Sequence, residues 1–241
     1  MILLIDTSQE KGIVALAKEG NVLHSEENNI AKEHAGWLHL AIGRILGEAK
    51  ITVRDLEAVS VVAGPGSYTG LRVGMAAAKG FCYALKIPLI TQNSLHLMAE
   101  SMISIALEKN ALICPMIDAR RDEVFTALYR IPPKAEGLRP KANRSSVNGH
   151  RSSDLMEILP PQAMILDKNA FEMELSGDPI IFSGSGAEKW KKITDSSHAI
   201  FEPQSNIIQS FARISQEDFS SGIQADPVYA EPVYLKEFFS Y

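Results

Sequence analysis

Cysteine is scarce in this chain. Cys82 and Cys114 are the two cysteines among 241 residues, and their spacing fits neither a metal site nor a redox pair. We therefore expect reduced thiols and a cytoplasmic protein. The opening stretch, MILLIDTSQEKG, has no basic segment, and its apolar run is too short for a signal peptide or a membrane span.

The chain also lacks an excess of positive charge. Its net charge is −5, with 46% hydrophobic and 22% charged residues, which is typical of an ordinary globular protein. This net charge argues against nucleic-acid binding by bulk electrostatic attraction, though not against a local basic patch. A local exception is the stretch 132–153, which carries five basic residues against the single acid Glu136. We interpret it as a flexible solvated loop, and the alternative is a basic arm that contacts phosphates.

Familiar catalytic and metal-binding motifs are missing as well. His34 and His39 are five positions apart, whereas a helical metal pair needs a spacing of four. Ser183 lies in SGSG without the leading glycine of a nucleophile elbow. No nucleophile, base and orienting group appear at recognisable spacing, which disfavours a peptidase. The sequence therefore predicts neither a catalytic residue nor a bound metal.

A long glycine-containing stretch, VVAGPGSYTGLRVGMAAAKGF, is the most informative part of the sequence. A phosphate-binding Walker loop would place a lysine after Gly70, and Leu71 stands there instead. The spacing is also one residue too long for a dinucleotide-binding loop. We expect Ser67 or Thr69 to cap the helix that follows, with phosphate binding by the same hydroxyls as the alternative.

Small residues recur along that helix, at Gly70, Gly74, Ala77 and Ala78, with Gly80 just after. A glycine inside a helix costs about 1 kcal/mol relative to alanine, so close approach of another backbone must offset the cost. The neighbour is either the protein's own sheet or a helix of a partner. Leu71, Met75 and Ala78 could face the sheet and leave the glycines for a partner.

Two halves of the chain follow the same plan. We expect strands at 2–6, 13–18, 22–26, 56–63 and 87–91, and helices at 33–50 and 71–85. The first three strands should form an antiparallel meander. LICPMIDARRDEVF repeats the start of the chain, and PIIFSGSG repeats the approach to the glycine stretch. The offsets from Asp6 to Asp118 and from Gly64 to Gly184 are 112 and 120 positions, so the sequence predicts a duplicated α/β architecture.

Several blocks together resemble the TsaB (YeaZ) family of bacterial tRNA threonylcarbamoyladenosine biosynthesis proteins. They are Ile5-Asp6-Thr7-Ser8, the stretch from Gly64 to Gly74, Ile117 to Phe125, and Pro232-Val233-Tyr234-Leu235-Lys236. In the block from Lys32 to Leu38, His34 and Leu38 match the family pattern.

The resemblance implies an actin- and Hsp70-like fold (ASKHA, ribonuclease H-like) with two similar lobes, each beginning with a three-stranded antiparallel meander. The expected domains are a partner-binding first lobe at 1–102, a second lobe at 103–204, and a C-terminal helix and tail at 205–241 that pack back on the body. The implied role is that of a non-catalytic subunit in the complex that adds threonylcarbamoyl to the adenosine beside the anticodon of tRNAs reading ANN codons.

The implied partners are a TsaD-like catalytic subunit and a TsaE-like ATPase, with tRNA bound through the complex and a homodimer formed by the chain alone. No cofactor of its own is expected, and ATP and metal belong to the partner subunits. The expected partner contacts are His34, Leu38, Gly70, Arg72, Gly74, Ala77 and Phe81. A weak nucleotide or phosphate contact is expected at Asp6, Gly64, Gly66, Ser67, Gly184 and Gly186. The alternative is an ATP-dependent small-molecule kinase of the same fold, with these loops lining a nucleotide cleft.

Overall fold

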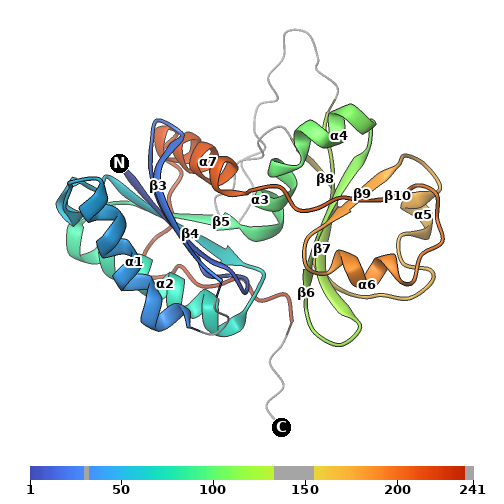
Figure 1. The fold of residues 1–241 in the computed structure, drawn as a ribbon, viewed down its shortest axis with the longest axis horizontal. Helices are drawn as coiled ribbons and strands as arrows, with labels where there is room; N and C mark the ends of the chain where they lie inside the picture. The colour runs from blue at the N-terminus through green and yellow to red at the C-terminus, as the bar shows by residue number, and fades with distance from the viewer. Residues whose placement is uncertain (30–32, 133–154, 237–241) are drawn as a thin grey trace. The chain divides into compact units, whose positions relative to one another are not determined.

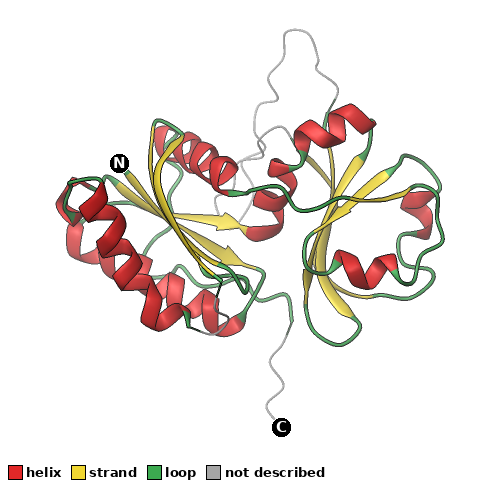
Figure 2. Ribbon diagram, viewed as in Figure 1, coloured by secondary structure: helices red, strands yellow, loops and turns green. Residues whose placement is uncertain are grey.

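Two five-stranded mixed sheets carry the fold, one in each of two structural units (Figures 1 and 2). The computed structural model describes residues 1–29, 33–132 and 155–236. Of these, residues 1–94 and 207–234 form the first unit, and residues 95–132, 155–206 and 235–236 form the second. The C-terminal helix and most of the tail therefore belong to the first unit. The expected flexible loop at 132–153 lies, apart from its first residue, outside the described residues.

The first unit has a sheet in the order β3-β2-β1-β4-β5. Its strands are β1 (Ile2–Asp6), β2 (Gly12–Lys18), β3 (Asn21–Asn28), β4 (Ala58–Gly64) and β5 (Leu89–Asn93). The first three pair antiparallel as a meander, and β4 and β5 join in parallel. Every residue of β1 and β4 is buried, as expected for strands covered on both faces.

Helices cover both faces of this sheet (Figure 1). Helices α1 (His34–Glu48) and α2 (Tyr68–Leu85) pack on the face that carries Leu3 and Ile5. Helix α7 (Ile208–Ser220) lies on the other face, where the Ser215 hydroxyl donates to the Ser60 hydroxyl of β4 at 2.8 Å. A short 3₁₀ turn, Val53–Asp55, precedes β4. The alternation of side chains along each strand thus separates the two helical layers.

The second unit repeats this topology, with a sheet in the order β10-β9-β6-β7-β8. Its strands are β6 (Leu112–Asp118), β7 (Glu123–Arg130), β8 (Met156–Ile165), β9 (Ile180–Ser183) and β10 (Ala199–Phe201). Its helices are α3 (Ser94–Ser101), α4 (Ile103–Lys109), α5 (Glu172–Leu175) and α6 (Ala187–Lys191). A cluster of aromatic rings from Phe171, Phe182 and Trp190 fills the core between α5, α6 and β9.

The predicted duplication is confirmed strand by strand. In both units an antiparallel meander is extended by two parallel strands, so that β6 corresponds to β1 and β9 to β4. Asp6 and Asp118 end the corresponding first strands. Gly64 ends β4 and Gly184 directly follows β9, the corresponding strand of the second unit. Both glycines have a positive φ, 119° at Gly64 and 94° at Gly184. The two-lobed α/β fold expected from the sequence is therefore the observed one.

Candidate functional site

The carboxyl end of β1 is the first candidate site, and its carboxylate is already bound by its own turn. Asp6 is buried, and its Oδ1 accepts from the backbone N–H of Ser8 at 2.8 Å and from the Ser8 hydroxyl at 2.7 Å. Burial raises the pKa of Asp6, while the two bonds from Ser8 and the nearby His34 act in the opposite direction. These contacts make Asp6 a turn-stabilising residue.

The glycine loop from Gly64 to Gly70 lies directly on that turn. The Ser67 N–H donates to the carbonyl of Ser8 at 2.6 Å, and the Thr7 hydroxyl donates to the carbonyl of Gly70 at 2.7 Å. The Ser67 hydroxyl accepts from the N–H of Gly70 at 3.3 Å. Ser67 is therefore the N-cap of α2, which confirms one of the two capping residues proposed from the sequence.

A phosphate cradle in this loop is disfavoured by the same contacts. A Cβ on Gly66 would lie 2.2 Å from the carbonyl oxygen of Ser8, so the loop has no space beneath it. The N–H groups of Ser67 and Gly70 donate within the chain. The nucleotide contacts expected at Asp6, Gly64, Gly66 and Ser67 remain a prediction that this geometry does not favour.

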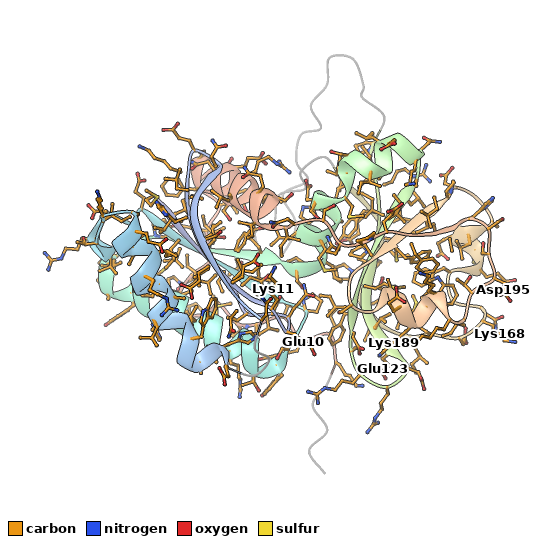
Figure 3. All side chains as sticks on the ribbon, in the orientation of Figure 1. Glu10, Lys11, Glu123, Lys168, Lys189 and Asp195 are labelled. Carbon is orange, nitrogen blue, oxygen red and sulfur yellow. The ribbon has the colours of Figure 1, made fainter. Side chains whose placement is uncertain are left out.

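The corresponding loop of the second unit is filled in a similar way. A Cβ on Gly184 would lie 2.4 Å from the carbonyl oxygen of Met116, and the N–H of Gly186 donates to that oxygen at 3.0 Å. The ammonium of Lys189, labelled in Figure 3, donates to Asp118 Oδ1 at 2.6 Å and to the carbonyl of Glu123 at 3.1 Å. A lysine of the chain thus occupies the place beside Asp118 where a cation would sit. Nucleotide contact at Gly184 and Gly186 likewise stays a prediction.

The small-residue stripe on α2 faces the protein's own sheet. A Cβ on Gly70 would lie 2.0 Å from the carbonyl oxygen of Thr7, and one on Gly74 would lie 2.4 Å from the Thr7 hydroxyl oxygen. Ala77 and Ala78 are buried in the same core. The prediction that Gly70 and Gly74 contact a partner's backbone is therefore wrong, because β1 and its turn occupy that space. The same prediction for Ala77 is corrected because Ala77 is buried in the chain's own core.

Two further predicted partner contacts on α1 also point inward. Leu38 is fully buried in the core, and His34 is 6% exposed with its Nε2 donating to the carbonyl of Gln9 at 2.9 Å. His34 attaches the start of α1 to the β1–β2 turn, and Leu38 anchors the helix on the sheet. Neither side chain is available at the surface, so both predictions are corrected. Arg72 is exposed and Phe81 is half-buried, so these two remain accessible.

The solvent side of the same two helices carries a second set of small residues. We call this surface the outer helix face. On α1 and α2 it consists of the exposed residues Gly36, Leu40, Gly43, Gly47, Arg72, Ala76, Gly80 and Tyr83. Spacings of three and four residues place each set on one side of its helix. His39 and Phe81, whose ring centroids are 6.2 Å apart, join the two helices.

The glycines of the outer helix face pack against no other element among residues 1–29, 33–132 and 155–236. At Gly36, Gly43, Gly47 and Gly80, no atom lies within 4 Å of the position that a Cβ would take. Each glycine inside a helix costs about 1 kcal/mol relative to alanine. Large apolar side chains stand beside them, since Leu40 is 64% and Tyr83 73% exposed. The surface combines open backbone with exposed apolar side chains.

Several contacts hold α1 and α2 rigidly in place. Glu26 of β3 accepts from the Trp37 indole N–H at 2.8 Å and from the Arg44 Nε at 2.8 Å. The Arg44 guanidinium, and the Trp37 bond after it, hold the pKa of Glu26 below its usual value. On α2, the Lys79 ammonium donates to the carbonyl of Ala230 in the C-terminal tail at 3.0 Å. The outer helix face is thus a preformed surface.

Metal-binding clusters are absent from the part of the chain that the structure describes. In residues 1–29, 33–132 and 155–236, no three His, Cys, Asp or Glu side chains are placed to hold a metal ion. Within the same ranges, no helix combines the length and hydrophobicity that a membrane span requires.

Comparison with known proteins settles the family. The family model for TsaD, described as tRNA N6-adenosine threonylcarbamoyltransferase, matches residues 21–232. The chain belongs to this family. Within it, the TsaB (YeaZ) resemblance is confirmed by curated relatives named tRNA threonylcarbamoyladenosine biosynthesis protein TsaB.

The TsaB of Bacillus subtilis is 27% identical over 194 residues, which cover 80% of this chain and 75% of the relative. The TsaB of Escherichia coli is 26% identical over 240 residues, 98% of this chain and 94% of the relative. A solved structure from Pseudomonas aeruginosa, described as an uncharacterized protein with similarity to peptidase YEAZ, superposes with a TM-score of 0.75. It is 22% identical and covers 98% of this chain and 99% of that chain, which supports the TsaB-like fold.

Most of the outer helix face escaped the sequence reasoning. Gly43 and Gly47 are absent from the predicted contacts, although both lie between the buried positions of a clear helical period. Their signal is a polar-face position occupied by glycine, where a helix normally favours alanine or a charged residue. The same test would have selected Gly80 over Gly74 on α2.

Proposed function

We propose that this chain is a non-catalytic subunit of the complex that forms threonylcarbamoyladenosine in tRNA, beside the anticodon of tRNAs that read ANN codons. Its membership of the TsaB group supports a role in this pathway. Its task is to bind and support a TsaD-like catalytic subunit. The observation that carries the proposal is the outer helix face with its four glycines open to solvent.

The energetics of that face favour a partner protein. The two helix-interior glycines of this face, Gly43 and Gly80, together cost about 2 kcal/mol relative to alanine in the isolated chain. Nothing within the described chain offsets this cost, because the space beside each glycine is open. A helix of another subunit can approach glycine backbones closely, and Leu40 and Tyr83 then supply the apolar anchors. We therefore assign the TsaD-like subunit to this surface, and a second copy of the chain when it is alone.

The chain's own polar groups support a non-catalytic role. Asp6, Ser67 and Asp118 all bond within the protein, and Lys189 neutralises Asp118. A kinase of this fold would need its carboxylates and loop N–H groups free for a magnesium nucleotide. We accordingly place ATP and metal on the partner subunits, including a TsaE-like ATPase, with tRNA bound through the complex.

Reconstitution of the modification tests the proposal. The purified chain alone should leave an unmodified tRNA that reads ANN codons unchanged. Threonylcarbamoyladenosine should form in this tRNA when a TsaD-like protein, a TsaE-like protein and an enzyme that makes the threonylcarbamoyl donor are added. Replacing Gly80 by leucine fills the space at the outer helix face and should abolish both complex formation and product, with a melting temperature no lower than that of wild type. Product formed by the chain without a TsaD-like subunit, or full activity of Gly80→Leu, would exclude the proposal.

A further inference from the structure

A stacked arginine, Arg72, lies on the outer helix face near the amino-terminal end of α2. The Arg72 guanidinium lies over the ring of Tyr68, 4.6 Å from its centroid. The Tyr68 ring in turn contacts the Tyr234 ring, with centroids 5.0 Å apart. Arg72 shares the exposed side of α2 with Ala76 and Gly80.

Backbone contacts of the C-terminal tail hold this stack in place. The N–H of Val233, next to Tyr234, donates to the carbonyl of Ala63 at 2.7 Å. The carbonyl oxygen of Val233 fits against Gly64, where a Cβ would approach it to 2.7 Å. The tail thus places the Tyr234 ring against the Tyr68 ring, and the Arg72 guanidinium stacks on Tyr68. A guanidinium fixed in this way loses little conformational freedom on binding.

Arg72 is a cation without a counter-ion in the described part of the chain. No carboxylate or carbonyl among residues 1–29, 33–132 and 155–236 accepts a hydrogen bond or forms an ion pair with it. Other cations on these two helices are engaged, since Arg44 pairs with Glu26 and Lys79 binds tail carbonyls. The planar fork of an arginine fits a carboxylate with two parallel hydrogen bonds.

We propose that Arg72 is a preformed anchor for a carboxylate of the partner subunit, held in position by Tyr68 and Tyr234. The inference rests on the proposed function, because it supplies the chemistry of the partner at the same surface. A protein carboxylate is favoured over an RNA phosphate because the chain carries a net charge of −5 and Arg72 borders small and apolar residues. Arginine and tyrosine are also the residues that dominate protein interfaces.

The test is the affinity between this chain and its TsaD-like subunit, measured by calorimetry at two salt concentrations. Arg72→Ala should weaken binding roughly 30-fold or more, as loss of one partner of a charge pair does. Arg72→Lys should fall between wild type and Arg72→Ala, because it keeps the charge and loses the fork and the stack. Binding by wild type should weaken with salt more steeply than binding by Arg72→Ala.

Control variants separate this inference from the proposed function. Arg54→Ala removes an exposed arginine from the 3₁₀ turn before β4, away from the outer helix face, and should leave affinity unchanged. Tyr234→Phe should bind normally and Tyr234→Ala more weakly, with thermal melts recorded for each. Unchanged affinity of Arg72→Ala while Gly80→Leu fails to bind would overturn the arginine anchor and keep the proposed function. Unchanged affinity of both would overturn both. Normal partner binding but weakened tRNA binding by Arg72→Ala would assign the arginine to RNA and overturn the inference.

Discussion

Adding methyl groups to the outer helix face separates the stability of the chain from its association. Gly43 lies in the middle of α1 and Gly80 in the interior of α2, and neither has an atom within 4 Å of a Cβ position. Replacing both by alanine should stabilise the isolated chain by about 2 kcal/mol, about 1 kcal/mol for each helix-interior site. For a chain of this size, the melting temperature should rise by about 4–8 °C.

The same double variant should bind the TsaD-like subunit more weakly, because each methyl group holds the partner's backbone away from the helix. We expect a loss of at least about tenfold in affinity, the equivalent of 1.4 kcal/mol. Differential scanning calorimetry and isothermal titration on one preparation give both numbers. A lower melting temperature would show that the space beside the glycines is not open. A higher melting temperature with unchanged affinity would show that the glycines serve no partner, and would refute the reasoning.

Three further predictions concern the interior of the first unit. Gly70→Ala should destabilise the chain by about 3 kcal/mol, because the new Cβ would lie 2.0 Å from the carbonyl oxygen of Thr7, and a melting temperature equal to wild type would contradict this packing. Ser67→Ala removes the N-cap of α2 and should cost about 1 kcal/mol in urea unfolding, with no loss expected if the cap is unimportant. Asp6→Asn should remove a pH dependence of the free energy of unfolding. Burial raises the folded-state pKa of Asp6, so the stability contributed by the protonated carboxyl group is complete below the unfolded-state pKa. That stability is lost as the pH rises through the folded-state pKa. The stability of Asp6→Asn relative to wild type should therefore increase from about pH 4 upward, and an increase toward lower pH would be inconsistent with a raised pKa.

Sequence patterns predicted the strands of the first unit well, because buried parallel strands read as continuous apolar runs. Residues 2–6 match β1, and the duplicated approach to Asp118 matches β6. The helix expected from residue 71 begins three residues earlier, at Tyr68, because Ser67 caps it. Local hydrogen-bonding chemistry was sufficient for these assignments.

Sequence patterns could not show whether the small residues of α2 face the sheet or the solvent. Leu71, Met75 and Ala78 face the sheet as expected, and Gly70 and Gly74 share that face with them. A wide buried stripe on a helix includes positions adjacent in sequence, so spacing alone cannot assign neighbouring small residues to opposite sides. Which side of α2 is buried depends on contacts with the β1–β2 turn, which lies more than sixty positions earlier in the sequence.

The arginine stack was equally invisible in the sequence. Tyr68 and Tyr234 are joined because the tail returns to Ala63 and Gly64, and this pairing depends on the tertiary fold. The family motif contains Arg72 but carries no information about its stacking partners. Chemistry that depends on contacts between distant segments needs the structure.

Hydrogen–deuterium exchange of the chain, with and without its TsaD-like subunit, tests the central proposal most directly. Binding at the outer helix face should slow exchange in peptides covering α1 and α2, which run from His34 to Glu48 and from Tyr68 to Leu85. Protection confined to the second unit, with both helices exchanging as in the free chain, would contradict the assignment of this surface to the partner.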